Sequence, residues 1–172
     1  MRSNYTRRLA FLAVATALSM ILSFVESQIP PLSAVPGVKI GLANIVSVFL
    51  LYRLGWKDAV CVSVIRVLLS SLLFGSFVSL TYSAFGAAFS LLVMIFAKAV
   101  LPFSPIGVSV LGAIAHNAGQ ILAAWIYLGN GAIVYYLIPL TVSGVLAGIF
   151  VGILGNCNYN SFIDFFNLFI SK

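Results

Sequence analysis

The chain consists largely of long apolar stretches in which charged side chains are rare. Six such stretches follow one another: Leu9–Val25, Ile40–Leu54, Ala59–Phe77, Leu80–Leu101, Ile106–Leu128 and Ala132–Leu154. A transmembrane helix needs about 20 mostly apolar residues, and most of these stretches approach or exceed that length. Charged residues make up 7% of the chain, compared with about 25% in soluble proteins. We therefore predict an all-α integral membrane protein in which residues 1–172 form one domain, a bundle of six transmembrane helices.

Residues that favour turns separate most of the stretches. Proline, glycine or both occur between the first and second stretches, the second and third, the fourth and fifth, and the fifth and sixth. The second stretch is short, and the break near residues 75–79 is weak, so a topology with five spans stays open. After the sixth stretch, residues 159–170 are aromatic and amphipathic, and we predict that they lie along the membrane interface.

Positive charges predict the orientation, because they are enriched on the cytoplasmic side of membrane proteins. With a cytoplasmic N-terminus, nearly all basic residues fall on that side: Arg2, Arg7, Arg8, Arg53, Lys57, Lys98 and Lys172. Both termini are therefore predicted to be cytoplasmic. Two arginines before an apolar run are also typical of a signal peptide, but the run continues to Val25 without a clear cleavage site, so we interpret it as a retained helix. Lys39 falls on the opposite side, which makes it a candidate for function.

A few charged or strongly polar residues lie within or beside the apolar stretches: Glu26, Lys39, Asn44, Arg66, His116, Asn117 and Gln120. A charged side chain at the bilayer centre costs roughly 2.5 to 3.5 kcal/mol on insertion scales, so it indicates a function or a partner. We predict that these residues bind a small solute, with Arg66 and Lys39 on its anionic groups and the others supplying hydrogen bonds. The alternatives are a buried ion pair of Arg66 that fixes helix register, and a structural hydrogen bond or proton relay of His116.

The first apolar stretch carries two different faces. Polar residues recur at helical spacing on one of them: Thr16, Ser19, Ser23 and Glu26. Small residues occupy another face, about 120° away by helix geometry: Ala10, Ala13 and Ala17. Small residues permit close approach of a second helix. Either both faces pack within the bundle, or the polar face lines a pocket while the alanine face docks a partner helix.

Glycines mark two further features. The outer loop from Glu26 to Asn44 contains three prolines, which stiffen it, and two glycines, which allow close backbone approach. This loop is either a rigid connector or a lid that folds over an outward-facing cavity. In the sixth stretch, glycines recur every fourth residue and predict a seam for helix packing, within the chain or to a partner: Gly144, Gly148 and Gly152.

The chain lacks the motifs of the common enzyme classes. There is no Walker A sequence, no GxSxG, no HExxH, and no aspartate cluster that could hold magnesium-bound diphosphate. The two cysteines show no metal-ligating spacing, and no basic run is long enough for a nucleic-acid patch. We therefore expect no cofactor, no metal site and no nucleic-acid partner. A membrane enzyme that uses only Glu26 and His116 remains an alternative.

Three segments resemble a known family. The longest, residues 26–45, reads Glu-Ser-x-Ile-Pro-Pro-Leu-x-x-Val-Pro-Gly-Val-Lys-Ile-Gly-Leu-Ala-Asn-Ile, and the other two are residues 66–75 and 107–120. They are similar to the signature of the Gx transporter family, which is also labelled heptaprenyl diphosphate synthase component I. The resemblance covers about residues 5–155. It implies a bundle like the S components of energy-coupling factor transporters, in which the first outer loop gates a solute and alanines on the first helix dock a coupling subunit.

These observations predict a substrate-binding membrane subunit rather than an enzyme. It would capture a small, partly anionic solute at the outer face of a bacterial, Gram-positive cell membrane for ATP-coupled uptake. The partners that the resemblance implies are an energy-coupling transmembrane subunit and ABC ATPases. The alternative is a non-transporting accessory subunit for isoprenoid synthesis (heptaprenyl or menaquinone) or for flavin-based extracellular electron transfer. In that case the partner would be a prenyl synthase or a flavoprotein.

Overall fold

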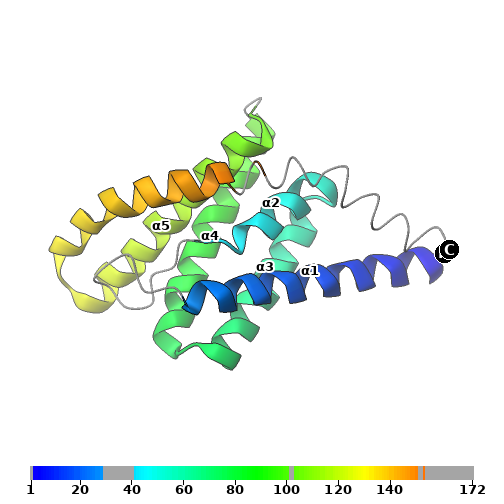
Figure 1. Ribbon diagram of the computed structural model, residues 1–172, viewed down its shortest axis with the longest axis horizontal. Coiled ribbons are helices and arrows are strands. Elements are labelled where there is room, and N and C mark those ends of the chain that lie inside the picture. The colour runs from blue at the N-terminus through cyan, green and yellow to red at the C-terminus, as the bar shows by residue number, and fades with distance from the viewer. Residues whose placement is uncertain (1, 29–40, 101–102, 151–152, 154–172) are drawn as a thin grey trace.

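The computed structural model describes residues 2–28, 41–100, 103–150 and 153, and every regular element within them is helical (Figure 1). The elements are α1 (Arg2–Gln28), α2 (Asn44–Arg53), α3 (Trp56–Phe74), α4 (Phe77–Val100), α5 (Pro105–Leu128), the 3-10 helix η1 (Gly131–Tyr136) and a last helix over residues 137–150. Lys39, Gly152 and the tail over residues 159–170 lie outside the described residues, as does most of the outer loop.

Four segments are long and apolar enough to cross a membrane: Tyr5–Gln28, Phe77–Val100, Pro105–Leu128 and Gly131–Phe150. They agree with the first, fourth, fifth and sixth predicted spans and are consistent with a multi-pass membrane protein. The six-span topology and the cytoplasmic placement of the termini stay predictions, because the second predicted span corresponds to the short helix α2 and the third to α3, which carries three charged residues.

The helix α2 is shorter than the predicted span Ile40–Leu54. It begins only at Asn44, because Gly41 has a positive φ of 93° and a turn follows it. Its 10 residues extend about 15 Å, roughly half the hydrocarbon thickness of a bilayer. The next helix, α3, has 19 residues and carries Lys57, Asp58 and Arg66.

The weak break near residues 75–79 is a helix boundary. Gly75 has an extended backbone and ends α3. Ser76 then caps the start of α4, because its side-chain oxygen accepts a hydrogen bond from the Ser79 amide at 3.2 Å. The third and fourth apolar stretches therefore form two helices.

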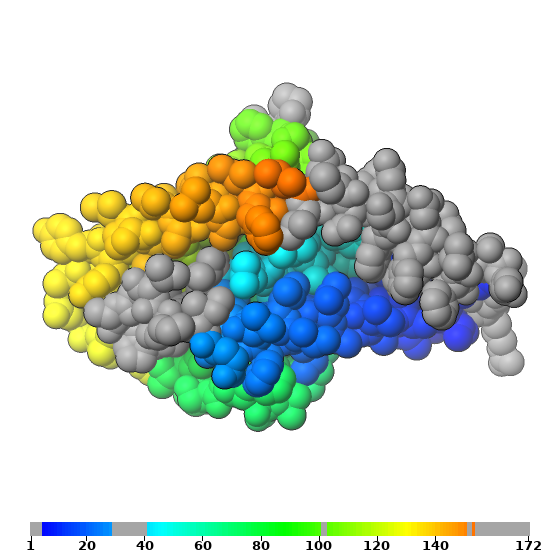
Figure 2. All heavy atoms as spheres, viewed as in Figure 1, coloured from blue at the N-terminus to red at the C-terminus, as the bar shows by residue number. Residues whose placement is uncertain are grey.

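The last apolar stretch begins as a 3-10 helix. Pro139 has no backbone N–H, so it cannot donate to the carbonyl four residues earlier. Residues 131–136 form η1, and the α-helix starts at residue 137, which places Pro139 in its first turn, where an N–H has no intrahelical partner. Figure 2 shows this last helix (orange) and α1 (blue) on the surface of the molecule, with α2 (cyan) visible between them.

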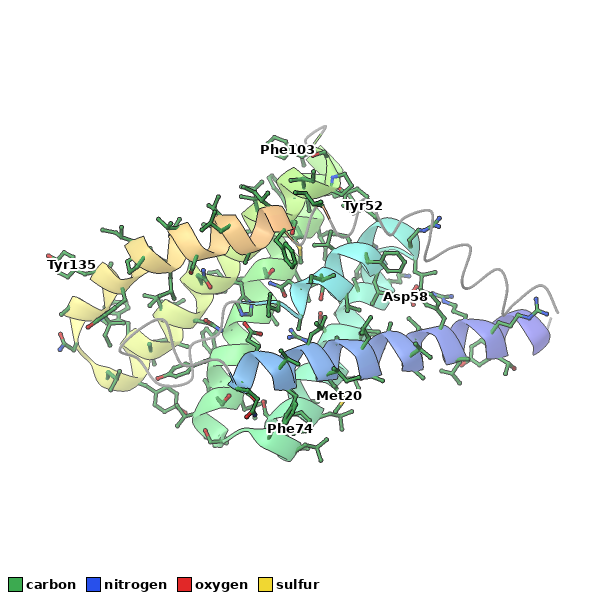
Figure 3. The ribbon with its side chains drawn as sticks, viewed as in Figure 1. Met20, Tyr52, Asp58, Phe74, Phe103 and Tyr135 are labelled. Atoms are coloured by element: carbon green, nitrogen blue, oxygen red, sulfur yellow. The ribbon has the colours of Figure 1, made fainter. Side chains whose placement is uncertain are left out.

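Basic residues from distant parts of the chain gather at one end of the bundle. Arg8 donates two hydrogen bonds to the Asp58 carboxylate, at 2.8 and 2.7 Å, and so joins α1 to the start of α3. Lys98 at the end of α4 donates to the Leu51 carbonyl at 2.6 Å and lies over the Tyr52 ring. In Figure 3, Tyr52 lies close to Phe103, whose carbonyl accepts from the tyrosine hydroxyl. The charge distribution predicts that this end faces the cytoplasm.

Candidate functional site

The polar face of α1 points into the bundle, whereas its alanine face points outward. Ser19, Ser23 and Glu26 are buried. The predicted docking residues are all exposed: Ala10, Ala13 and Ala17. The alternative in which both faces pack within the bundle therefore does not describe α1. Its two faces are positioned for different contacts.

Arg66 is buried in the middle of α3, and its side chain reaches α1. The Nη1 atom donates a hydrogen bond to the Ser23 hydroxyl at 3.3 Å. Glu26, one turn further along α1, attracts the guanidinium electrostatically. Among the described residues, the Nε and Nη2 atoms of Arg66 have no hydrogen-bond acceptor. A buried cation is thus held by one hydroxyl and by the field of one carboxylate.

Glu26 holds the backbone that leads into α2. Its Oε1 atom accepts hydrogen bonds from the amides of Gly41 and, at 3.4 Å, of Leu42. The positive φ of Gly41 turns its amide toward this carboxylate. The carboxylate therefore joins α1 to the start of α2, close to Arg66.

Gly41 connects the Arg66 side of the site to a second group of polar residues. A Cβ atom on Gly41 would lie 3.2 Å from both the Asn44 amide nitrogen and the His116 ring. Asn44 in turn donates to the Ser90 hydroxyl of α4 at 3.2 Å. The backbone at Gly41 thus lies between Glu26 on one side and the side chains of Asn44 and His116 on the other.

His116 and Gln120 form the wall of the site on α5. They are one helical turn apart, both are buried, and their side-chain nitrogens are 3.0 Å from each other. The ring lies directly against the α4 backbone, because a Cβ on Gly86 would be only 2.7 Å from it. Glycine at position 86 therefore makes room for the histidine.

Asn117 lies in a different place from the other predicted site residues. Its amide nitrogen donates to the Leu140 carbonyl of the last helix at 2.6 Å, and a Cβ on Gly144 would lie 2.6 Å from that nitrogen. Gly148 is similarly close to the α5 backbone at Val110. The described part of the predicted glycine seam thus faces α5, and Asn117 is inserted into it.

The structure brings together five of the seven predicted binding residues: Glu26, Asn44, Arg66, His116 and Gln120. Sequence reasoning missed Ser90 and Gly86, which contact Asn44 and His116 from α4. Their spacing of four residues was the available signal, since it places two small residues on one helix face. The pairing of Arg8 with Asp58 was also missed, because fifty residues separate the two.

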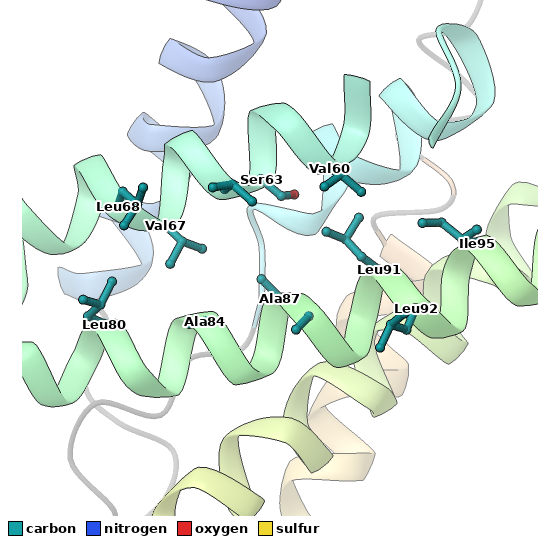
Figure 4. A pocket seen from close by; sticks show the side chains of 12 residues that line it. Val60, Ser63, Val67, Leu68, Leu80, Ala84, Ala87, Leu91, Leu92 and Ile95 are labelled. Atoms are coloured by element: carbon teal, nitrogen blue, oxygen red, sulfur yellow. The ribbon is translucent and has the colours of Figure 1, made fainter. Parts of the chain in front are cut away.

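A surface hollow lies elsewhere, between α3 and α4 (Figure 4). It has a volume of about 530 Å³ and is lined by valine, leucine, isoleucine and alanine, with Ser63 as its one polar residue. The Ser63 hydroxyl is already bonded to Ser47 at 2.8 Å. Such a groove offers no group that could orient a polar solute, so we assign the candidate site to the polar cluster.

The polar cluster offers groups that can bind a small solute. Within the described residues, no group of three His, Cys, Asp or Glu side chains is placed to hold a metal ion. The cluster does combine a cation, a carboxylate, two amides and an imidazole from four helices. These groups can hydrogen-bond an anionic solute and hold it in one orientation.

No curated protein and no solved structure matches this chain. The chain does match the family profile described as Heptaprenyl diphosphate synthase component I, over residues 15–157. The match includes α2 to α5 and every residue of the polar cluster. That description names one component of a synthase and so suggests a membrane accessory subunit, whereas the resemblance to S components stays a prediction. Because the match extends over most of its length, the chain belongs to the heptaprenyl diphosphate synthase component I family.

Proposed function

We propose that this protein is a membrane subunit that binds a small, partly anionic solute in the polar cluster around Arg66. The observation that carries the proposal is the Arg66 guanidinium, which is buried and keeps two N–H donors without an acceptor among the described residues. An arginine inside a membrane protein is costly and most often marks a substrate or ion site. Glu26, Asn44, His116 and Gln120 would supply further hydrogen bonds.

We assign the two remaining predicted residues different roles. Lys39 would add a second positive charge for the same solute; it lies outside the described residues. Asn117 would stabilise the contact between α5 and the last helix, because its amide is already bonded to the Leu140 carbonyl. An amide that joins two helices in this way is a common packing device in membranes.

The leading form of the proposal is a subunit for ATP-coupled uptake, with the solute entering from the outer face. The exposed alanines of α1 support it, because they offer a coupling subunit a smooth surface on the side of α1 opposite the buried serines. In this form the partners are a transmembrane coupling subunit and two ABC ATPases.

The family description favours a second form, in which the chain is an accessory subunit of isoprenoid synthesis. The description names one component of a heptaprenyl diphosphate synthase, which implies another component as partner. The polar cluster would then hold the head group of a prenyl diphosphate or a quinone. Flavin-based electron transfer, with a flavoprotein partner, belongs to the same form.

Purification from the native membrane in mild detergent tests the proposal. Mass spectrometry would identify the proteins and the small molecules that stay bound to wild type and to Arg66→Gln. We expect wild type to retain an anionic solute that Arg66→Gln loses, while both retain the same protein partners. Two ATPases among the partners would establish uptake, and a prenyl synthase or flavoprotein without ATPases would establish the accessory form. Equal retention of the solute by Arg66→Gln would remove Arg66 from the site.

A further inference from the structure

We propose that Arg66 receives two oxygens of an oxyanion, a carboxylate or a phosphate group, side-on through its Nε–H and Nη2–H, and that Ser23 is the positioning residue for this contact. The inference rests on the proposed function and specifies the chemical group that the site recognises. It also adds Ser23, which was expected only as part of a polar face, to the functional residues.

The positions of the bonded and unbonded donors on Arg66 carry the proposal. In a guanidinium, Nη1 lies on the same side as Cδ, whereas Nε–H and Nη2–H lie along the opposite edge and point in nearly the same direction. In this protein Nη1 is the atom that donates to Ser23, and Nε and Nη2 are the two atoms without an acceptor among the described residues. Those two parallel donors match the two oxygens of one carboxylate or phosphate.

The polar side chains near Arg66 have other partners. One turn on, the Ser70 hydroxyl donates to the Val67 carbonyl of its own helix. One turn back, the Ser63 hydroxyl is bonded to Ser47 of α2. Glu26 accepts from the amides of Gly41 and Leu42 through Oε1. The groups that α1 and α3 place around the guanidinium therefore leave its Nε–Nη2 edge for a ligand.

Burial makes this edge selective. Arg66 is 5% exposed and Ser23 is 3% exposed, so bulk water competes little for the two donors. Inside such a site a pair of charge-assisted hydrogen bonds is stronger and more directional than the attraction of a point charge. A lysine keeps the charge but offers no pair of parallel donors in a fixed plane. Chloride likewise satisfies the charge but cannot accept from both donors through two separate oxygens.

Ser23 determines the direction in which the edge points. Its hydroxyl accepts from Nη1 and so restricts rotation of the guanidinium about its own axis. Loss of that hydroxyl leaves the charge and the two donors in place but lets their direction vary. We therefore expect Ser23→Ala to weaken oxyanion binding several-fold, and Ser23→Thr, which keeps a hydroxyl at the same position, to restore it.

The test uses the full chain in lipid nanodiscs with ¹⁵N-labelled arginine and follows the Nε–Hε resonances by NMR. The Arg66 resonance is the one that is protected from solvent exchange and absent from Arg66→Lys. Sodium acetate and sodium phosphate are the probes, and sodium chloride at matched ionic strength is the control. We expect acetate or phosphate to move the Arg66 Hε resonance downfield and chloride to leave it in place. A response to acetate alone identifies a carboxylate ligand, and a response to phosphate alone identifies a phosphate group.

Two results would overturn the side-on contact. One is an Arg66 resonance that none of the probes moves, or that chloride moves equally. The other is equal probe affinity in wild type and in Arg66→Lys, for which we expect at least a tenfold loss. If Arg66→Lys does not fold, the side-on contact is still tested by the shift of the wild-type resonance and by the probe affinities of Ser23→Ala and Ser23→Thr. If wild type retains a solute in the purification experiment despite either of these results, the side-on contact is wrong but the proposed function stands. If wild type neither binds the probes nor retains a solute, the proposed function is wrong as well.

Discussion

The contact between α4 and α5 differs in kind from the contact between α1 and α3. The α4–α5 contact depends on glycine: a Cβ on Gly119 would lie 2.6 Å from the Phe85 carbonyl oxygen, and one on Gly112 would lie 2.6 Å from Met94. The α1–α3 contact depends on side chains, with Arg8 on Asp58 at one end and Arg66 on Ser23 further along. In the apolar segment of α5, 61% of the residues are buried, compared with 22% in the apolar segment of α1.

This difference indicates how the candidate site is built. Backbones that touch through glycine cannot shift without a clash, so α4 and α5 form a rigid wall that holds His116 and Gln120. Side-chain hydrogen bonds can exchange partners, so α1 can move relative to that wall at lower cost. The solute site would therefore lie between a rigid part and a separable part of the molecule, with Gly41 between them.

The largest effect on stability is expected from Gly119→Ala. The new methyl group would collide with the α4 backbone, which cannot yield as a side chain can, and overpacking of this kind costs about 1–3 kcal/mol or more. Chemical unfolding in detergent micelles would measure the loss. Gly131→Ala is the matched control, because nothing lies within 4 Å of its Cβ position. Equal stability of the two variants would contradict the rigid wall.

The second-largest effect on stability is expected from Gly86→Ala, a variant that should also change the geometry of the candidate site. Its Cβ would meet the ring of His116 rather than backbone, so the ring can rotate away, and we expect a cost of about 1–2 kcal/mol. The displaced ring would also break its contact with Gln120. Histidine ¹⁵N shifts should therefore change in this variant but not in Gly131→Ala. An unchanged histidine spectrum would show that the ring does not contact α4.

A smaller effect is expected at the end of α1, from the Arg8–Asp58 pair. Both hydrogen bonds come from one nitrogen, Nη2, and Arg8 is about half exposed, so we expect a coupling energy of at most about 1 kcal/mol. A double-mutant cycle with Arg8→Ala and Asp58→Ala, followed by unfolding in detergent, would measure it. Arg7→Ala is the control for loss of charge alone. Additive effects of the two single variants would show that the pair does not join α1 to α3.

The smallest effect on stability is expected from Ala13→Leu, because position 13 is exposed and surface substitutions usually change stability by less than about 0.5 kcal/mol. Under the uptake form of the proposal, the larger side chain would nevertheless block the coupling subunit. Co-purification of partners with Ala13→Leu and with the control Val14→Leu would compare adjacent exposed positions. Full partner recovery with both variants would remove the alanine face from the interface.

The helices themselves could be predicted from the sequence with few errors. Apolar composition and turn residues located the four long helices, whereas the boundary at Gly75 was predicted only as a weak break near residues 75–79. Two details escaped because they depend on single residues. The positive φ of Gly41 delays the start of α2, and residues 131–136 form a 3-10 helix ahead of Pro139.

The site was predictable only to the level of helix faces. The spacing of Ser23 and Glu26 correctly placed both on a buried face of α1. It could not show that Ser23 meets Arg66, since 43 residues separate them. Asn117 illustrates the limit most clearly. It follows His116 directly in the sequence, yet the rotation of one residue along α5 turns it toward the last helix and away from the polar cluster.

The sequence by itself therefore determined the class of protein, the positions of the main helices and the residue types that a buried polar site can use. These properties depend on local composition and on helical periodicity, which a single chain displays directly. Only the tertiary structure decided which polar residues meet, that Glu26 holds the Gly41 amide, and that Nε and Nη2 of Arg66 have no acceptor among the described residues. The reason is physical: periodicity assigns a direction to each side chain, but the neighbour in that direction depends on how whole helices pack.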